Sequence, residues 1–158
     1  MTLRSLPFAA LLMTLLAAPA LAGPAEDTFL AKLVGSWSGK GTLTGAESGV
    51  VDCSMSFRQR SAGVTFRGKC DVTGFGAQTF SGTLSYNDKL NRYEAASASG
   101  DITPGVKSGK SVVFTTKLKG LATGQSVMKL STTRVVVDTT VKRSASSGDI
   151  KSHIELKR

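Results

Sequence analysis

The sequence of 158 residues contains one histidine, two cysteines, four prolines and one tryptophan, and aromatic residues make up only 6% of it. An isolated cysteine pair beside one histidine lacks the further ligands that a metal site needs, so no metal site is expected. No Ser-His-Asp spacing or paired carboxylates are present either. Beyond Ala22, no apolar run is long enough to span a membrane.

The segment 1–22 has the three-part layout of a secretory signal peptide. Residues 1–4 form a positive start, residues 6–18 form a nearly unbroken apolar run, and Ala20-Leu21-Ala22 is a small-x-small cleavage site before Gly23. No cysteine follows the cleavage point, which argues against a lipid anchor. We therefore expect the segment 1–22 to be removed and the rest to be exported, to a bacterial periplasm or the medium.

The segment 23–158 suits a single domain. Residues 23–34 predict a short helix, with proline near its start, acidic residues in its first turn and Gly35 as its stop. From Gly35 onward apolar residues alternate with polar ones, which predicts strands at 35–44, 50–60, 64–72, 78–86, 91–98, 111–119, 125–133, 134–142 and 149–157. Residues 101–109, which contain Pro104, predict a longer loop or an irregular edge. Eight to ten strands in sequential hairpins over residues 35–158 favour an all-β, antiparallel up-and-down barrel.

Cys53 and Cys70 are the only cysteines, and in an exported protein such a pair predicts a disulfide. A two-residue turn at Ser61-Ala62 pairs residues whose numbers add up to 123, which sets the two cysteines opposite each other. The same register sorts apolar and polar side chains onto opposite faces. A structural bridge is therefore expected, with no redox role.

The alternation predicts a lumen without ionisable side chains, so we expect no enzyme activity and no catalytic residue. The candidate lumen residues are Trp37, Phe57, Phe66, Phe80, Tyr93 and Phe114. Many small inward residues accompany them, among them Thr116, Thr139 and Ser152. Either these leave a cavity for a small apolar or amphipathic ligand, or the side chains fill a narrow barrel.

The net charge of the whole chain is +9, and it falls to +8 when Arg4 leaves with the leader. The excess of positive charge lies after residue 101, where there are eleven basic residues and only three acidic ones. The predicted basic outer surface consists of Lys117, Lys119, Lys129, Lys142 and Lys151. Such a surface predicts an anionic envelope partner, namely phospholipid, lipopolysaccharide or acidic polysaccharide, or a protein; the alternative is a surface that serves solubility alone. Nucleic acid is not expected, since no aromatic residues are interleaved with the basic ones.

Histidine commonly binds haem and metals, and His153 is the single histidine of the chain. Ile150, Ile154 and Leu156 set the parity of its strand and place His153 outside, although a one-residue bulge would reverse this. We therefore expect no cofactor, haem included.

Gly35-Ser36-Trp37, directly after the short helix, resembles the G-x-W signature of lipocalins and related calycin barrels. The resemblance implies that the helix closes one end of the barrel and that Trp37 packs on a basic residue from the last strands. Arg143, Lys157 and Arg158 are all candidates for that partner.

Similar openings occur in small bacterial lipocalin-like domains of unknown function. They also occur in nitrobindin-like barrels, which bind haem through an inward histidine near the C-terminus, and residues 152–158 are similar to that end. Bacterial inhibitors of secreted metalloproteases are also small exported barrels with one disulfide, and they insert an N-terminal trunk into the protease cleft. Residues 23–27 are very short for such a trunk.

Overall fold

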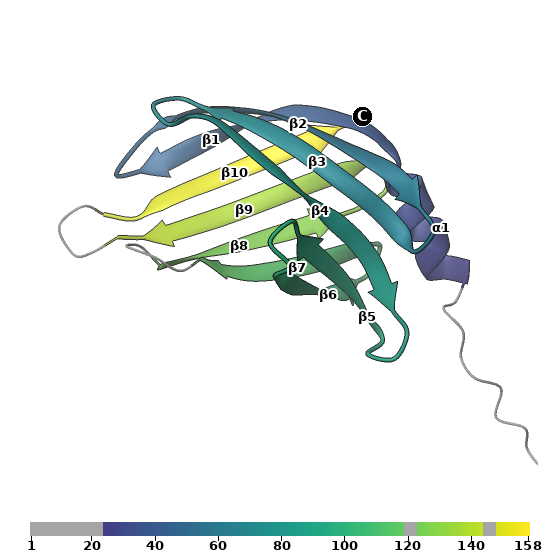
Figure 1. Cartoon of the computed structure of the whole chain (residues 1–158). Helices are drawn as coiled ribbons and strands as arrows, with labels where there is room; N and C mark the ends of the chain where they lie inside the picture. The colour runs from purple at the N-terminus through teal and green to yellow at the C-terminus, as the bar shows by residue number, and fades with distance from the viewer. Residues whose placement is uncertain (1–23, 119–122, 144–147) are drawn as a thin grey trace, which may run out of the picture.

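A computed structural model of the chain describes residues 24–118, 123–143 and 148–158, so the predicted signal peptide lies outside the described residues. These residues form a closed antiparallel barrel preceded by one helix (Figure 1). The elements are α1 (Pro24–Leu33), β1 (Gly35–Gly45), β2 (Gly49–Arg60), β3 (Gly63–Val72), β4 (Gly76–Asn87), β5 (Arg92–Ser97), β6 (Ile102–Ser108), β7 (Ser111–Leu118), β8 (Thr123–Leu130), β9 (Arg134–Lys142) and β10 (Ile150–Lys157). Each strand pairs with its neighbours in sequence, and β1 pairs with β10 to close the barrel. The predicted up-and-down barrel is confirmed.

Helix α1 lies at one end of the barrel (Figure 1). It begins at a proline, which suits a first turn whose N–H groups have no partner, and Glu26 and Asp27 follow in that turn, where the helix dipole favours acidic groups. Leu30 and Leu33 form its buried face. Within the described residues, no helix is long and apolar enough to cross a membrane.

Strand β6 corrects the prediction of a loop over residues 101–109. Pro104 lies within this strand and pairs with Glu94 of β5. The ladder between β6 and β7 begins only at Gly105, so the N–H that proline lacks leaves no gap in that ladder. The proline therefore made residues 102–108 look like a loop, although the pairing of β6 with β5 and β7 accommodates it.

The pairing of β2 with β3 follows the predicted register. Cys53 lies opposite Cys70 and Phe57 opposite Phe66. The two cysteines form a disulfide, and their Cα atoms are 4.1 Å apart. The side chain of Cys53 is buried in the core, as a structural bridge requires.

Removing this disulfide is expected to lower stability without changing the fold. The bridge joins residues 17 apart in sequence, and a loop of that length gives about 3 kcal/mol on the chain-entropy account. For the double variant Cys53→Ser/Cys70→Ser we expect a melting temperature lower by about 10 °C, measured by far-UV circular dichroism. Two reactive thiols in the unreduced wild-type protein would contradict the bridge itself.

Candidate functional site

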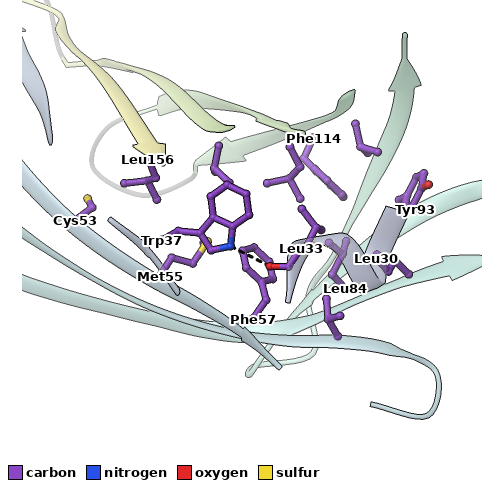
Figure 2. Packing of buried hydrophobic residues seen from close by; sticks show 14 of the residues in the cluster. Leu30, Leu33, Trp37, Cys53, Met55, Phe57, Leu84, Tyr93, Phe114 and Leu156 are labelled. Atoms are coloured by element: carbon purple, nitrogen blue, oxygen red, sulfur yellow. Dashed lines mark hydrogen bonds between the residues drawn. The ribbon is translucent and has the colours of Figure 1, made fainter. Parts of the chain in front are cut away.

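The end of the barrel next to α1 is filled by large apolar side chains (Figure 2). Leu30 and Leu33 from the helix enter the core beside Trp37 of β1. The rings of Trp37 and Phe57 meet edge to face with centroids 6.4 Å apart, and Phe29 packs edge to face on Tyr93 at 5.4 Å. Helix α1 and these large side chains therefore close this end of the barrel, and together they are called the plug.

Trp37 contacts both the carboxyl end of α1 and the C-terminal residue Arg158. Its indole Nε1 donates a hydrogen bond of 2.9 Å to the carbonyl of Leu33. The guanidinium of Arg158 lies 4.7 Å from the centre of the indole ring, a cation–π distance. Arg158 also donates to the carbonyls of Lys32 and Val34. Its side chain thus caps the carboxyl end of α1 while covering the tryptophan.

Of the three candidates for the basic partner of Trp37, the structure selects Arg158. Arg143 instead forms an ion pair with Glu47, at 2.8 Å. Lys157 points outward and pairs with Glu155, at 3.1 Å. The arrangement that the G-x-W resemblance implied is therefore present, with its partner identified.

The plug is uncharged. Burial raises the pKa of Tyr93 to about 12, and the nearby carboxylate of Glu26 adds to this effect. No polar or charged side chain is buried among the residues that the structure describes. The predicted oily interior holds in this part of the barrel.

Four of the six candidate lumen residues belong to the plug, and each is at most 3% exposed: Trp37, Phe57, Tyr93 and Phe114. Phe57 and Phe114 line a cavity of only about 20 Å³, whose other walls include Phe66 and Met128. That is room for about one water molecule, whereas sites for drug-sized ligands have about 300–1,000 Å³. These four side chains therefore fill the barrel at this end and leave no room there for a ligand.

The other two candidates, Phe66 and Phe80, lie flat against the inner wall. Each faces a glycine across the β3–β4 pair, Phe66 opposite Gly82 and Phe80 opposite Gly68. A Cβ atom added at Gly68 would lie 2.1 Å from the ring of Phe80, so that ring occupies the space that the glycine leaves open. Phe80 is 39% exposed although it faces inward. This part of the wall is apolar and accessible.

A row of hydroxyl side chains crosses the inner wall on the opposite strands. The row consists of Thr103, Thr116, Ser126, Thr139 and Ser152, one from each of β6 to β10. Adjacent strands place them about 4.8 Å apart. The hydroxyls of Thr103 and Thr116 are 3.3 Å apart, and those of Ser126 and Thr139 are 3.2 Å apart. All five side chains are half-buried, so their remaining hydrogen-bonding capacity faces the lumen.

Apolar side chains flank this row on the same strands. Met128, Val137 and Ile154 lie one inward position closer to α1 and are only partly buried. The sequence predicted inward positions for Thr116, Thr139 and Ser152 but treated them as spacers. Thr103 was not predicted to point inward because its strand was not predicted. Ser126 could have been found, since strict alternation along β8 places it on the inner face. The inner surface away from the plug thus combines an apolar wall with a hydroxyl row.

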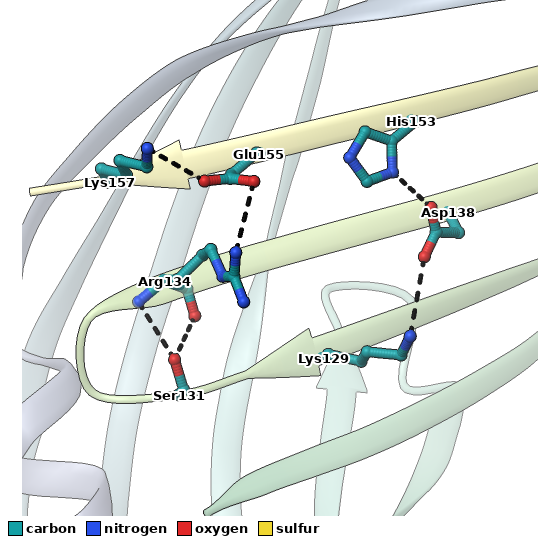
Figure 3. Close-up of polar contacts among 7 residues, drawn as sticks. All are labelled: Lys129, Ser131, Arg134, Asp138, His153, Glu155 and Lys157. Atoms are coloured by element: carbon teal, nitrogen blue, oxygen red, sulfur yellow. Dashed lines mark hydrogen bonds and ion pairs between the residues drawn. The ribbon is translucent and has the colours of Figure 1, made fainter.

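His153 lies on the outer face, as its parity predicted (Figure 3). Its Nδ1 is 2.6 Å from Oδ1 of Asp138 on β9, and the side chain is 59% exposed. Farther along the same strands, Arg134 and Lys157 both pair with Glu155. The hydrogen bond from Lys157 and the nearby positive charges hold the pKa of Glu155 below its usual value. The histidine belongs to an outer network of ion pairs and does not enter the lumen.

Four lysines of the predicted basic surface lie among the described residues, and one of them is paired with a carboxylate. Lys117, Lys129, Lys142 and Lys151 are exposed, and Lys119 lies outside the described residues. Lys129 is 4.0 Å from the carboxylate of Asp138, which also pairs with His153. Of these described lysines only Lys129 has a carboxylate within 4 Å, whereas on β9 and β10 it is Arg134 and Lys157 that pair with Glu155.

The segment considered as a protease-binding trunk is part of the helix. Residues 24–27 lie in the first turn of α1. Glu26 forms an ion pair with Lys107 of β6, at 3.2 Å. This contact fixes the start of the helix to the barrel.

No model of a known protein family matches the chain, and no curated protein matches it in sequence. Among solved structures, it is similar to an S-type phycobiliprotein lyase from Guillardia theta, with 12% identity and a TM-score of 0.57 over 82% of this chain and 89% of the other. It is also similar to Rv2717c from M. tuberculosis, with 13% identity and a TM-score of 0.56 over 86% of this chain and 98% of the other. These similarities support the lipocalin-like barrel fold and assign no family.

The comparison contradicts the prediction that this protein is not an enzyme. One of the two similar barrels is a lyase, so the fold does not argue against catalysis. The prediction rested on the premise that chemistry needs an ionisable side chain inside the barrel. An uncharged lumen therefore gives no ground for excluding an enzyme.

Proposed function

We propose that this protein is an exported lipocalin-like barrel whose lumen binds a small amphipathic ligand. The single observation that carries the proposal is the hydroxyl row on β6 to β10, which faces an apolar wall on β3 and β4. A ligand lying between them would place its hydrocarbon surface on Phe66 and Phe80. Its polar atoms would exchange hydrogen bonds with Thr116, Ser126 and Thr139.

Two features support the choice of the half of the lumen away from α1. The plug end is packed almost without space, with a cavity of about 20 Å³. Beyond it, inward side chains such as Phe80 and Ile154 remain partly exposed, so an apolar ligand would remove them from water. The proposed site therefore lies beyond the sealed end, where inward apolar side chains are still partly in contact with water.

Export is supported by two further observations. The layout of the segment 1–22 is that of a signal peptide, and disulfides such as Cys53–Cys70 persist in oxidising compartments. The finer proposal is a periplasmic or secreted location.

Replacing one lumen hydroxyl by a methyl group is expected to weaken ligand binding. The variant Thr139→Val keeps the shape of the side chain and removes one hydrogen bond, worth about 1 kcal/mol, so the Kd for a fluorescent fatty acid such as cis-parinaric acid should rise about fivefold. The matched control is Thr140→Val, because Thr140 is the next residue on β9 and points outward. Fluorescence titration measures both values.

Native mass spectrometry of the wild-type protein from its own host would complete this test. We expect an adduct of a few hundred daltons that is lost on unfolding. Equal affinities for both threonine variants and the wild type, together with an adduct-free mass, would refute a ligand in the lumen.

A further inference from the structure

A line of four basic side chains follows the outer face of the β2–β3 hairpin: Arg60, Arg58, Arg67 and Lys69. They occupy four successive outward rows, in which Arg60 lies opposite Gly63, Arg58 opposite Thr65, Arg67 opposite Ser56 and Lys69 opposite Ser54. Each row thus contributes one cation and one small partner. Since outward rows are two residues apart, the positive charges repeat about every 7 Å over about 20 Å.

These four cations have no acidic partner within the described part of the chain, in contrast to Arg134 and Lys157 on β9 and β10. All four side chains are exposed, and none is within 4 Å of a described carboxylate. Asp52 and Asp71 lie in the next row beyond Lys69, where they end the line, and Asp52 pairs with Lys40. A row of unbalanced like charges opposes folding, which a bound anion would relieve.

The surface beneath these cations is hollowed and carries hydroxyl groups. Two depressions of about 380 and 440 Å³ adjoin one another on this outer face, and Arg67 lines both. Their outward hydroxyl side chains are Ser36, Ser38, Ser54, Ser56, Thr65, Ser81 and Thr83. These short side chains form the base of the groove, called the hydroxyl floor, and the longer cationic side chains extend beyond it.

We propose that this groove, defined by Arg58, Arg60, Arg67 and Lys69, binds a linear acidic polysaccharide. Guanidinium groups bind carboxylate or sulfate through two parallel hydrogen bonds, and the hydroxyl floor matches the hydroxyls of sugar rings. A line of regularly spaced cations suits a chain with regularly spaced anions. The groove lies on the outside of the barrel and is independent of the lumen.

The composition of the groove argues against two other anionic partners. A single-stranded nucleic acid is held by aromatic side chains that stack on its bases, and the outward positions of β2 and β3 along this line carry none. A membrane surface is flat and favours large apolar side chains that enter it, whereas this face is hollowed and carries no large apolar side chain at the outward positions of β2 and β3 along this line. Both remain outcomes of the test.

The test compares two triple variants that remove the same charge. Arg58→Gln/Arg60→Gln/Arg67→Gln alters the groove, and Lys117→Gln/Lys142→Gln/Lys151→Gln alters exposed lysines elsewhere. The probe is a decamer of polygalacturonate, titrated calorimetrically at low and moderate salt. We expect affinity to fall about 30-fold for the arginine variant, at about threefold for each exposed cation, and less than threefold for the lysine variant.

Circular dichroism spectra and melting temperatures close to those of the wild type would show that both variants fold. Equal losses in the two variants would mean unspecific attraction by net charge and overturn the proposal. A wild-type protein without affinity for the polygalacturonate would also overturn the proposal. Binding of the wild type to anionic vesicles or to oligo-dT that the arginine variant loses would then identify a membrane or a nucleic acid as the partner.

Discussion

Replacing Trp37 with alanine is expected to destabilise the protein by about 3–5 kcal/mol, the usual cost of truncating a fully buried tryptophan. The side chain is 1% exposed and lies between α1 and the barrel wall. The variant would leave a cavity, free the Leu33 carbonyl from its hydrogen bond and remove the ring that Arg158 covers. Because one ring connects three parts of the fold, we expect α1 to detach before the barrel unfolds.

Urea unfolding followed by far-UV circular dichroism measures this effect, since the variant has no tryptophan left for fluorescence. The variant Arg158→Met keeps an unbranched stem over the ring and removes the guanidinium, so it should cost only about 1–2 kcal/mol. A loss below about 1 kcal/mol for Trp37→Ala, well short of the usual cost, would show that the plug does not depend on this residue.

The second large effect is expected at the seam between β1 and β10, where the barrel closes. A Cβ atom on Gly39 would lie 2.0 Å from the backbone oxygen of Glu155 and 3.0 Å from Cα of Leu156. Those atoms are backbone and cannot rotate away, so Gly39→Ala must push the two strands apart. We expect a loss of about 3 kcal/mol, at the upper end for overpacked sites, together with faster amide exchange along β1 and β10.

Gly68→Ala is the matched control for this prediction. Its Cβ atom would meet the ring of Phe80 at 2.1 Å, an equally short distance. That ring is 39% exposed and can turn away, so the expected cost is below about 1 kcal/mol. Equal losses in the two variants, measured by urea unfolding, would contradict the idea that the seam is the rigid point of the barrel.

Local patterns predicted most of this architecture because they depend on neighbours close in sequence. The alternation of apolar residues defined nine strands, and the turn at Ser61-Ala62 fixed the register that joins Cys53 to Cys70. The helix was predicted from its end signals alone. Strand β6 was missed because the tolerance for Pro104 depends on which residues of β7 pair with β6, and no local pattern contains that information.

The chemistry of the surfaces depended on contacts between distant residues. Net charge along the chain predicted a basic face on the last strands, and it did not show that Asp138 and Glu155 pair there with Lys129, Arg134 and Lys157. A line of four cations without partners among the described residues lies on β2 and β3, in a half of the sequence whose overall charge is balanced. Composition counts charges, whereas ion pairing depends on which strands lie side by side.

The same distinction applies to the lumen. Alternation along each strand was enough to place Trp37, Phe66 and Thr139 on the inner face, because successive side chains of a strand point to opposite sides. Whether an inward residue fills the barrel or lines an accessible wall depends on strand coiling and on where α1 enters. Those are properties of the closed sheet, and they assign Trp37 to the plug and Thr139 to the proposed site.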